Sequence, residues 1–162
     1  MASDLSKVPL LARREIEARI LAPVVEALAP SCGREQVMAK VRQAVEGLAV
    51  QMGADYAARA EVTSLAELDT LVELWSFDGA LEVEQLVHSE KAYDFNVRRC
   101  RYAEMYRELG IAELGLVMSC QRDFAFFKGF DPRVRLTRTR TIMEGADHCD
   151  FRFRWVEKGE QA

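Results

Sequence analysis

The residues in this sequence best suited to chemistry are its four cysteines. They lie far apart in the chain and form no Cys-x-x-Cys pair; they are Cys32, Cys100, Cys120 and Cys149. Close cysteine pairs are typical of zinc sites and disulfide oxidoreductases, whereas a lone thiolate can act as a nucleophile. Each thiol must therefore be judged by its own surroundings.

Cys120 is followed three residues later by Asp123. On a helix, residues three apart share a face, so the two side chains could form a thiol and carboxylate pair. Asp123 stands beside phenylalanines at 124, 126 and 127, where a carboxylate without a partner would be costly to bury. Alternatively, Asp123 is solvated or pairs with neighbours of Arg122, and Cys120 fills a gap in the core; the spacing alone favours neither interpretation.

Cys100 lies where a predicted strand gives way to a predicted helix. The unpaired amides and the dipole of a helix N-terminus favour a thiolate, and Arg98, Arg99 and Arg101 add positive charge beside it. We therefore expect Cys100 to react faster than Cys120 if it is exposed. The alternative is a small apolar residue buried at the junction, which the position alone favours.

Cys149 begins a segment in which two kinds of side chain alternate, as they do on a strand. One face carries apolar residues, namely Cys149, Phe151, Phe153 and Trp155. The other face carries polar residues, namely His148, Asp150, Arg152 and Arg154. Cys149 is therefore either a core residue or a thiol that reaches inward to a site between sheet and helices. Asp150 and Arg152 are more often a cross-strand charge pair.

Arginines recur at every second or third position of residues 135–140, at Arg135, Arg138 and Arg140. A polar strand of this kind could line a cavity, with an arginine fork that binds a carboxylate. A charged edge strand is an equally good interpretation. The two histidines, His88 and His148, are weak signals individually, although an imidazole is the usual base for a thiol.

The first 76 residues have the apolar spacing of helices. We expect three helices there, with Pro23 kinking or ending the first, and residues 30–33 separating the first from the second. Ser64 and Glu67 are spaced as a capping box that opens the third.

From residue 77 the pattern mixes strands and short helices. Residues 81–87 and 93–99 predict one hairpin, and residues 134–143 and 148–155 predict a second. Between them, two helices are expected, one ending before Gly110 and one at Gly129. The predicted fold class is α+β: N-terminal helices followed by an antiparallel sheet of about four strands, whose one face is covered by helices.

Composition limits the classes of function. The chain has 162 residues, of which 49% are hydrophobic and 30% charged, which predicts a single domain over 1–162 with a helical part (1–76) and an α+β part (77–156). A formal net charge of −4 disfavours nucleic-acid partners. No apolar stretch is long enough to span a membrane, and the N-terminus carries charges where a signal peptide needs an apolar run. We expect a cytoplasmic protein with reduced thiols.

Three blocks of the sequence resemble a known family. They are CRYAE at 100–104 with LG at 109–110, SCQRDF at 119–124, and RTRTIMEG at 138–145 leading to CDFRF at 149–153. Over residues 75–155 the chain resembles the L-2-amino-thiazoline-4-carboxylic acid hydrolase family. The resemblance extends to cysteines at Cys100, Cys120 and Cys149 and an aspartate at Asp123.

The resemblance implies that a small cyclic amidine bearing a carboxylate is opened by hydrolysis of a C–N bond. A thiolate can attack the sp² carbon of such a ring, and a carboxylate can manage protons. We expect Cys120 to be the nucleophile, with Asp123 orienting or deprotonating it, in part through His148, and with Cys100 and Cys149 in the same site. Four residues are assigned to the substrate, namely Arg138, Thr139, Asp150 and Arg152. We expect neither metal nor cofactor.

A second hypothesis is a sensor or binding module without turnover. In it Cys100, Cys120 and Cys149, with Asp123 or His148, converge on a small ligand or on Zn²⁺. The absence of a close cysteine pair speaks against a structural zinc site. In both hypotheses the partner is a small molecule, and association into a homo-oligomer is left open.

Overall fold

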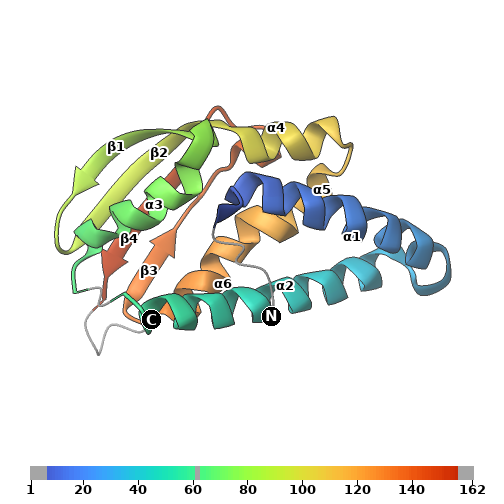
Figure 1. The fold of residues 1–162 in the computed structure, drawn as a ribbon, viewed down its shortest axis with the longest axis horizontal. Coiled ribbons are helices and arrows are strands. Elements are labelled where there is room, and N and C mark those ends of the chain that lie inside the picture. Colours follow the sequence, from blue (N-terminus) through green and yellow to red (C-terminus); the bar gives the residue numbers. More distant parts are fainter. Residues whose placement is uncertain (1–6, 61–62, 157–162) are drawn as a thin grey trace.

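The computed structural model describes residues 7–60 and 63–156, and it has a four-stranded antiparallel sheet (Figure 1). The strand order is β1-β2-β4-β3, with neighbours antiparallel throughout. The strands are β1 (Leu81–His88), β2 (Ala92–Cys100), β3 (Val134–Thr137) and β4 (Cys149–Trp155). The α+β fold class and the two pairs of strands predicted from the sequence are confirmed.

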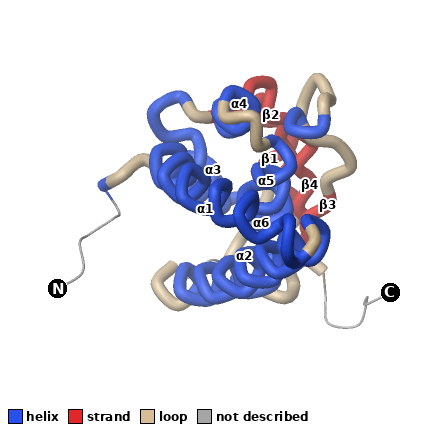
Figure 2. The backbone as a smooth tube through the Cα atoms, turned by 90° about the vertical axis from the view of Figure 1, so that its right-hand side faces the viewer, coloured by secondary structure: helices blue, strands red, loops and turns tan. Residues whose placement is uncertain are grey.

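Helices precede the sheet and separate its two pairs of strands. The α-helices are α1 (Leu10–Cys32), α2 (Arg34–Ala57), α3 (Asp69–Ser76), α4 (Arg101–Glu108), α5 (Ala112–Gly115) and α6 (Gln121–Phe130). Short helical turns are η2 (Leu65–Leu68), η3 (Phe77–Gly79), η4 (Leu116–Cys120) and η5 (Ile142–Glu144). Figure 2 shows most helices on one side of the sheet. Among the helices described, none combines the length and the apolar composition needed to cross a bilayer.

The first helix is longer than its prolines suggested. Helix α1 continues past Pro23 and ends only before Gly33, whose φ of 81° breaks the helical path. Ala18 and Val25, on either side of Pro23, are both buried in the core. Their packing holds the helix together where the proline removes one backbone hydrogen bond.

The predicted capping box is only half formed. Ser64 Oγ accepts a hydrogen bond from the Ala66 amide at 3.1 Å, as a cap does. The Glu67 carboxylate, however, accepts from the amide of Thr63 at 2.9 Å rather than from that of Ser64. The element that begins after Ser64 is the 3₁₀ turn η2, which leads directly into α3.

Strand β3 is shorter than the predicted 134–143 and ends at Thr137. The Asp150 carboxylate accepts hydrogen bonds from the backbone amides of Thr139 and Arg140, at 2.9 and 2.8 Å. Thr141 then caps η5. Because these side chains satisfy the backbone groups locally, the chain leaves the sheet after four residues.

The predicted inward face of β4 is confirmed, because Cys149, Phe151 and Phe153 are all buried. Phe95 on β2 stacks on Phe151 with ring centroids 4.7 Å apart. These rings belong to a core formed by the sheet with α3 and α6, and a second core lies between α1, α2 and α4. Cys100 packs against both cores, so it stands where they meet.

Helices α2 and α6 cross with their backbones in contact at two glycines. A Cβ atom added to Gly53 would lie 2.0 Å from the carbonyl oxygen of Phe126, and one added to Gly129 would lie 1.9 Å from that of Val50. No side chain fits at either position. The two glycines therefore fix the position of α6 against α2.

Gly53→Ala and Gly129→Ala should each lower the free energy of unfolding by about 1–3 kcal/mol or more, because the added methyl group meets backbone atoms that cannot rotate away. The matched control is Gly47→Ala on the same helix α2, where an added Cβ has nothing within 4 Å. That change should be neutral or stabilising by up to about 1 kcal/mol, because alanine favours helix. Urea unfolding measures all three, and equal effects would contradict the close crossing.

Candidate functional site

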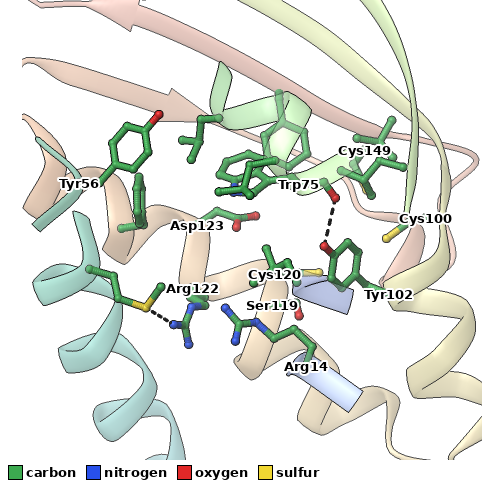
Figure 3. Close-up of a pocket in the computed structure, with 18 of the residues that line it drawn as sticks. Arg14, Tyr56, Trp75, Cys100, Tyr102, Ser119, Cys120, Arg122, Asp123 and Cys149 are labelled. Carbon is green, nitrogen blue, oxygen red and sulfur yellow. Dashed lines mark hydrogen bonds between the residues drawn. The ribbon is translucent and has the colours of Figure 1, made fainter. Parts of the chain in front are cut away.

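A cavity of about 440 Å³ lies between the sheet and the helices (Figure 3). Most of its lining is apolar, and side chains from α1, α2, α3, α6 and strands β1, β2 and β4 contribute to it. Five of the nine predicted site residues line it, namely Cys100, Cys120, Asp123, Arg138 and Cys149. The structure therefore brings together the three thiols, the carboxylate and one arginine.

A π-helical turn, η4, brings Ser119 and Cys120 to the cavity. The amide of Gln121 donates to the carbonyl of Leu116, five residues earlier, which is the hydrogen bond of a π-helix. Such turns are often found at functional sites because they insert one residue into a helix. The Ser119 hydroxyl is held by the hydroxyl of Tyr106 at 3.2 Å.

Asp123 and Arg138 form an ion pair in the cavity wall. Arg138 Nη1 lies 2.7 Å from Asp123 Oδ2. The side chain of Arg138 is only 4% exposed, and that of Asp123 is 23% exposed. Arg138 Nη2 also donates to the backbone carbonyl of Cys120. The guanidinium is packed between the rings of Phe124 and Phe151, 5.0 and 4.8 Å from their centroids.

Burial affects the two partners of this pair differently. It raises the pKa of Asp123 above its ordinary value, although Arg138 opposes the shift. Burial alone would lower the pKa of Arg138, but the facing carboxylate raises it above the usual value. The guanidinium is therefore charged, and among the groups that lower the pKa of Asp123 it has the largest effect.

All three cavity thiols are neutral at rest, because burial disfavours the thiolate. Burial raises the pKa of Cys100 to about 11, and it raises the pKa values of Cys120 and Cys149 as well. Arg138 acts in the opposite direction on Cys120, while the charge of Asp123 adds to the rise. No thiol here is activated in advance by its surroundings.

The expectation that helix amides and three arginines would favour a thiolate at Cys100 is wrong. Cys100 Sγ does accept a hydrogen bond from the Ala103 amide, at 3.4 Å, as the N-terminal cap of α4. That contact lowers its pKa less than burial raises it. Arg98, Arg99 and Arg101 each bind an oxygen elsewhere on the molecule and do not contact the sulfur.

The other four predicted site residues do not line the cavity. Thr139 Oγ1 donates to Asp150 at 2.7 Å, and this contact holds the chain after β3. Arg152 donates to the carbonyl of Phe95 at 2.8 Å and to the Asn96 side chain. The alternation that turns Cys149 inward turns Asp150 and Arg152 to the opposite face of β4.

His148 is also on that side, with Nδ1 2.8 Å from the Asp147 carboxylate. It does not contact Cys120 or Asp123 in a way that would relay a proton between them. Within residues 7–60 and 63–156, no group of three or more His, Cys, Asp or Glu side chains is arranged to hold a metal ion.

Sequence reasoning missed four cavity arginines, namely Arg13 and Arg14 on α1, Arg59 after α2, and Arg122 on α6. Arg14 is buried, beside apolar residues of the first helix. The available signal was a pair of arginines three residues after Leu10 and Leu11, at positions that continue the helix's apolar face.

Comparison with known proteins gives one family, and solved structures that include a sensory domain. The model of the family described as L-2-amino-thiazoline-4-carboxylic acid hydrolase matches residues 13–153. None of the curated proteins compared with the chain matches it. A crystal structure of the phenol-responsive sensory domain of the transcription activator PoxR with phenol is similar at 12% identity, with a TM-score of 0.48, covering 87% of this chain and 75% of that one.

Removing one partner of the buried ion pair should destabilise the fold. Arg138→Met should lower the free energy of unfolding by about 3–5 kcal/mol at pH 7.5, because Asp123 is left buried without its partner. The pKa of Asp123 is raised in the folded state, so folding takes up a proton, and the penalty disappears as the pH falls through that pKa.

Urea unfolding at pH 7.5 and pH 5.5 measures this effect. The deficit of Arg138→Met should be smaller at the lower pH, and adding Asp123→Asn should recover part of it at pH 7.5. A deficit that is the same at both pH values, and that Asp123→Asn leaves unchanged, would show that the ion pair is not the cause.

Thiol alkylation should follow exposure. Cys32 is exposed, whereas Cys100 and Cys120 are partly buried and Cys149 is buried. Iodoacetamide at pH 7.5 should therefore modify Cys32 first, because the thiolate is the reacting form and the raised pKa values suppress it at the other three. Peptide mass mapping gives the order, and unfolding in urea should equalise the four rates. Modification of Cys100 before Cys32 would contradict this account.

Proposed function

Because the chain belongs to the L-2-amino-thiazoline-4-carboxylic acid hydrolase family, we propose that it hydrolyses a C–N bond in a small cyclic amidine that carries a carboxylate. The observation that carries the proposal is that Cys120, Asp123 and Arg138 lie together on the wall of one cavity. A thiol, a carboxylate and a guanidinium supply a nucleophile, a proton acceptor and a stabilising charge.

The neutral thiol of Cys120 must lose its proton as it attacks. Asp123 follows it by three residues at the start of α6, and Figure 3 shows both side chains at the cavity. Arg138 binds Oδ2 of Asp123, so Oδ1 is the oxygen assigned to take the proton. A protonated amidine is itself cationic, and its arrival beside Cys120 would lower the pKa of the thiol.

The proposed reaction has two stages. The sulfur of Cys120 bonds to the amidine carbon while its proton passes to Asp123, and the ring C–N bond then breaks as the ring nitrogen takes that proton. Water next adds to the same carbon, with Asp123 as base, and the carbon–sulfur bond breaks to restore the thiol. The product is the ring-opened amino acid.

A second candidate function is binding of a small molecule without turnover. Two observations favour it: the three thiols are neutral at rest, and most of the cavity lining is apolar. Ligand pockets of binding modules have this character. The zinc form of this hypothesis has no support in the described residues, where no suitable group of ligands occurs.

Turnover of 2-amino-2-thiazoline-4-carboxylate, with a panel of cyclic amidines and imides, separates the two functions. Purified protein should open the thiazoline ring, and Cys120→Ala should lower kcat/KM at least about a hundredfold, because the nucleophile is lost. Cys32→Ala, at the exposed cysteine, is the matched control and should retain full activity. Undiminished turnover by Cys120→Ala would end the nucleophile assignment. Binding of the panel with no turnover would establish the binding module.

A further inference from the structure

A second polar region of the cavity is formed by arginines that the proposed reaction does not use. Arg13 and Arg14 come from α1, and Arg122 comes from α6. Figure 3 shows Arg14 and Arg122 beside each other near Ser119 and Cys120. Burial and the charge of Arg14 lower the pKa of Arg122 to about 10, so the two cations act on each other.

Among the described residues, the carboxylate that binds these arginines directly is that of Glu17, which is partly exposed. The side chain of Arg14 is 6% exposed, and it lies 2.6 Å from Glu17, which is 47% exposed. Arg122 donates to the thioether of Met52, a weak acceptor. Nε of Arg13 is buried without a hydrogen-bond partner. An unmatched buried donor is costly, so Nε of Arg13 points to an acceptor that comes from outside the chain.

The charges of the residues that line the whole cavity also indicate an anionic ligand. Its lining includes five arginines and two aspartates, although the chain as a whole has a formal net charge of −4. One of the two, Asp123, is paired with Arg138, and the other, Asp55, accepts a hydrogen bond from Gln51 at 2.8 Å. The cavity is therefore a positive region in an acidic protein, which concentrates anions.

We propose that Arg14 and Arg122 form the subsite that binds the carboxylate of the ligand. This inference rests on the proposed function for the kind of ligand, while binding of the anion itself is testable without turnover. Guanidinium groups bind carboxylates through paired, charge-assisted hydrogen bonds, and two of them side by side suit a single carboxylate.

This assignment replaces Arg138 as the group that holds the substrate acid. Arg138 already binds Asp123 and the carbonyl of Cys120, and its faces are covered by two phenylalanine rings. Arg122, in contrast, lines the same cavity as Cys120, and Figure 3 shows both side chains there. A carboxylate at Arg122 and a ring against Cys120 therefore fit one small molecule.

The test uses two probes that cannot be hydrolysed in this way, thiazole-4-carboxylate and thiazole-4-carboxamide, and isothermal titration calorimetry. The wild-type chain should bind the carboxylate at least tenfold more tightly than the amide. Arg122→Met and Arg14→Met should lose this preference. Arg19→Met is the matched control on α1, because Arg19 is exposed and pairs with Glu15, and it should keep the preference.

A second measurement needs no variant, which covers the case that Arg14→Met fails to fold. In ¹⁵N NMR spectra of the wild-type chain, thiazole-4-carboxylate should shift the Nε–H signals of Arg14 and Arg122, and the amide should not. Equal affinity for the two probes would overturn the proposal. So would a preference that survives in both Arg122→Met and Arg14→Met and is lost in Arg138→Lys.

The two proposals can fail separately. Cys120→Ala should keep the tenfold preference for thiazole-4-carboxylate while it loses turnover of the thiazoline. Retained preference without any turnover in the wild type would support the anion subsite and remove the hydrolase. Turnover with no preference for the carboxylate would support the hydrolase and remove the subsite.

Discussion

The ion pair between Asp123 and Arg138 is the constraint on which the rest of the site depends. Neither charge could be buried alone, so helix α6 and the segment after β3 must meet where the two side chains meet. There the guanidinium also donates a hydrogen bond to the carbonyl of Cys120, and these residues form part of the cavity wall. The same pair determines the electrostatics there, because Arg138 opposes both the protonation of Asp123 and the neutral form of the Cys120 thiol.

The site as a whole suits a ligand that brings its own charges. Its thiols are neutral and the Asp123 carboxylate is paired with Arg138, whereas Arg122 donates to a thioether and Arg14 to the partly exposed carboxylate of Glu17. A cyclic amidine with a carboxylate is a zwitterion at neutral pH, with a cation for the Asp123 side and an anion for the arginine side. Such a site would be activated by its substrate, and it would leave its cysteines protected when empty.

Local patterns predicted much of this arrangement, and long-range contacts account for what they missed. Alternation along β4 was sufficient to turn Cys149 inward, and a spacing of three placed Cys120 and Asp123 on one helical face. The pKa of Cys100 could not be predicted, because burial between two cores outweighs its place at a helix N-terminus. The role of Asp150 was missed for a similar reason, since its acceptors are used by amides 10 and 11 residues away in the chain. A buried arginine such as Arg14 is recognised only when the helices that cover it are in place.

The π-helical turn η4 makes this stretch of chain sensitive to length. It is confined on both sides, because Gly115 lies against the ring of Tyr106 before it and Gly129 lies against the backbone of α2 after it. Losing one residue between 116 and 120 would restore a regular helix, but each residue turns a helix by about 100°. Because both ends are held, this rotation would fall on Ser119 and Cys120 and would change the directions of their side chains. A chain that differs here by a single deletion could thus keep the same fold while presenting different side chains to the cavity.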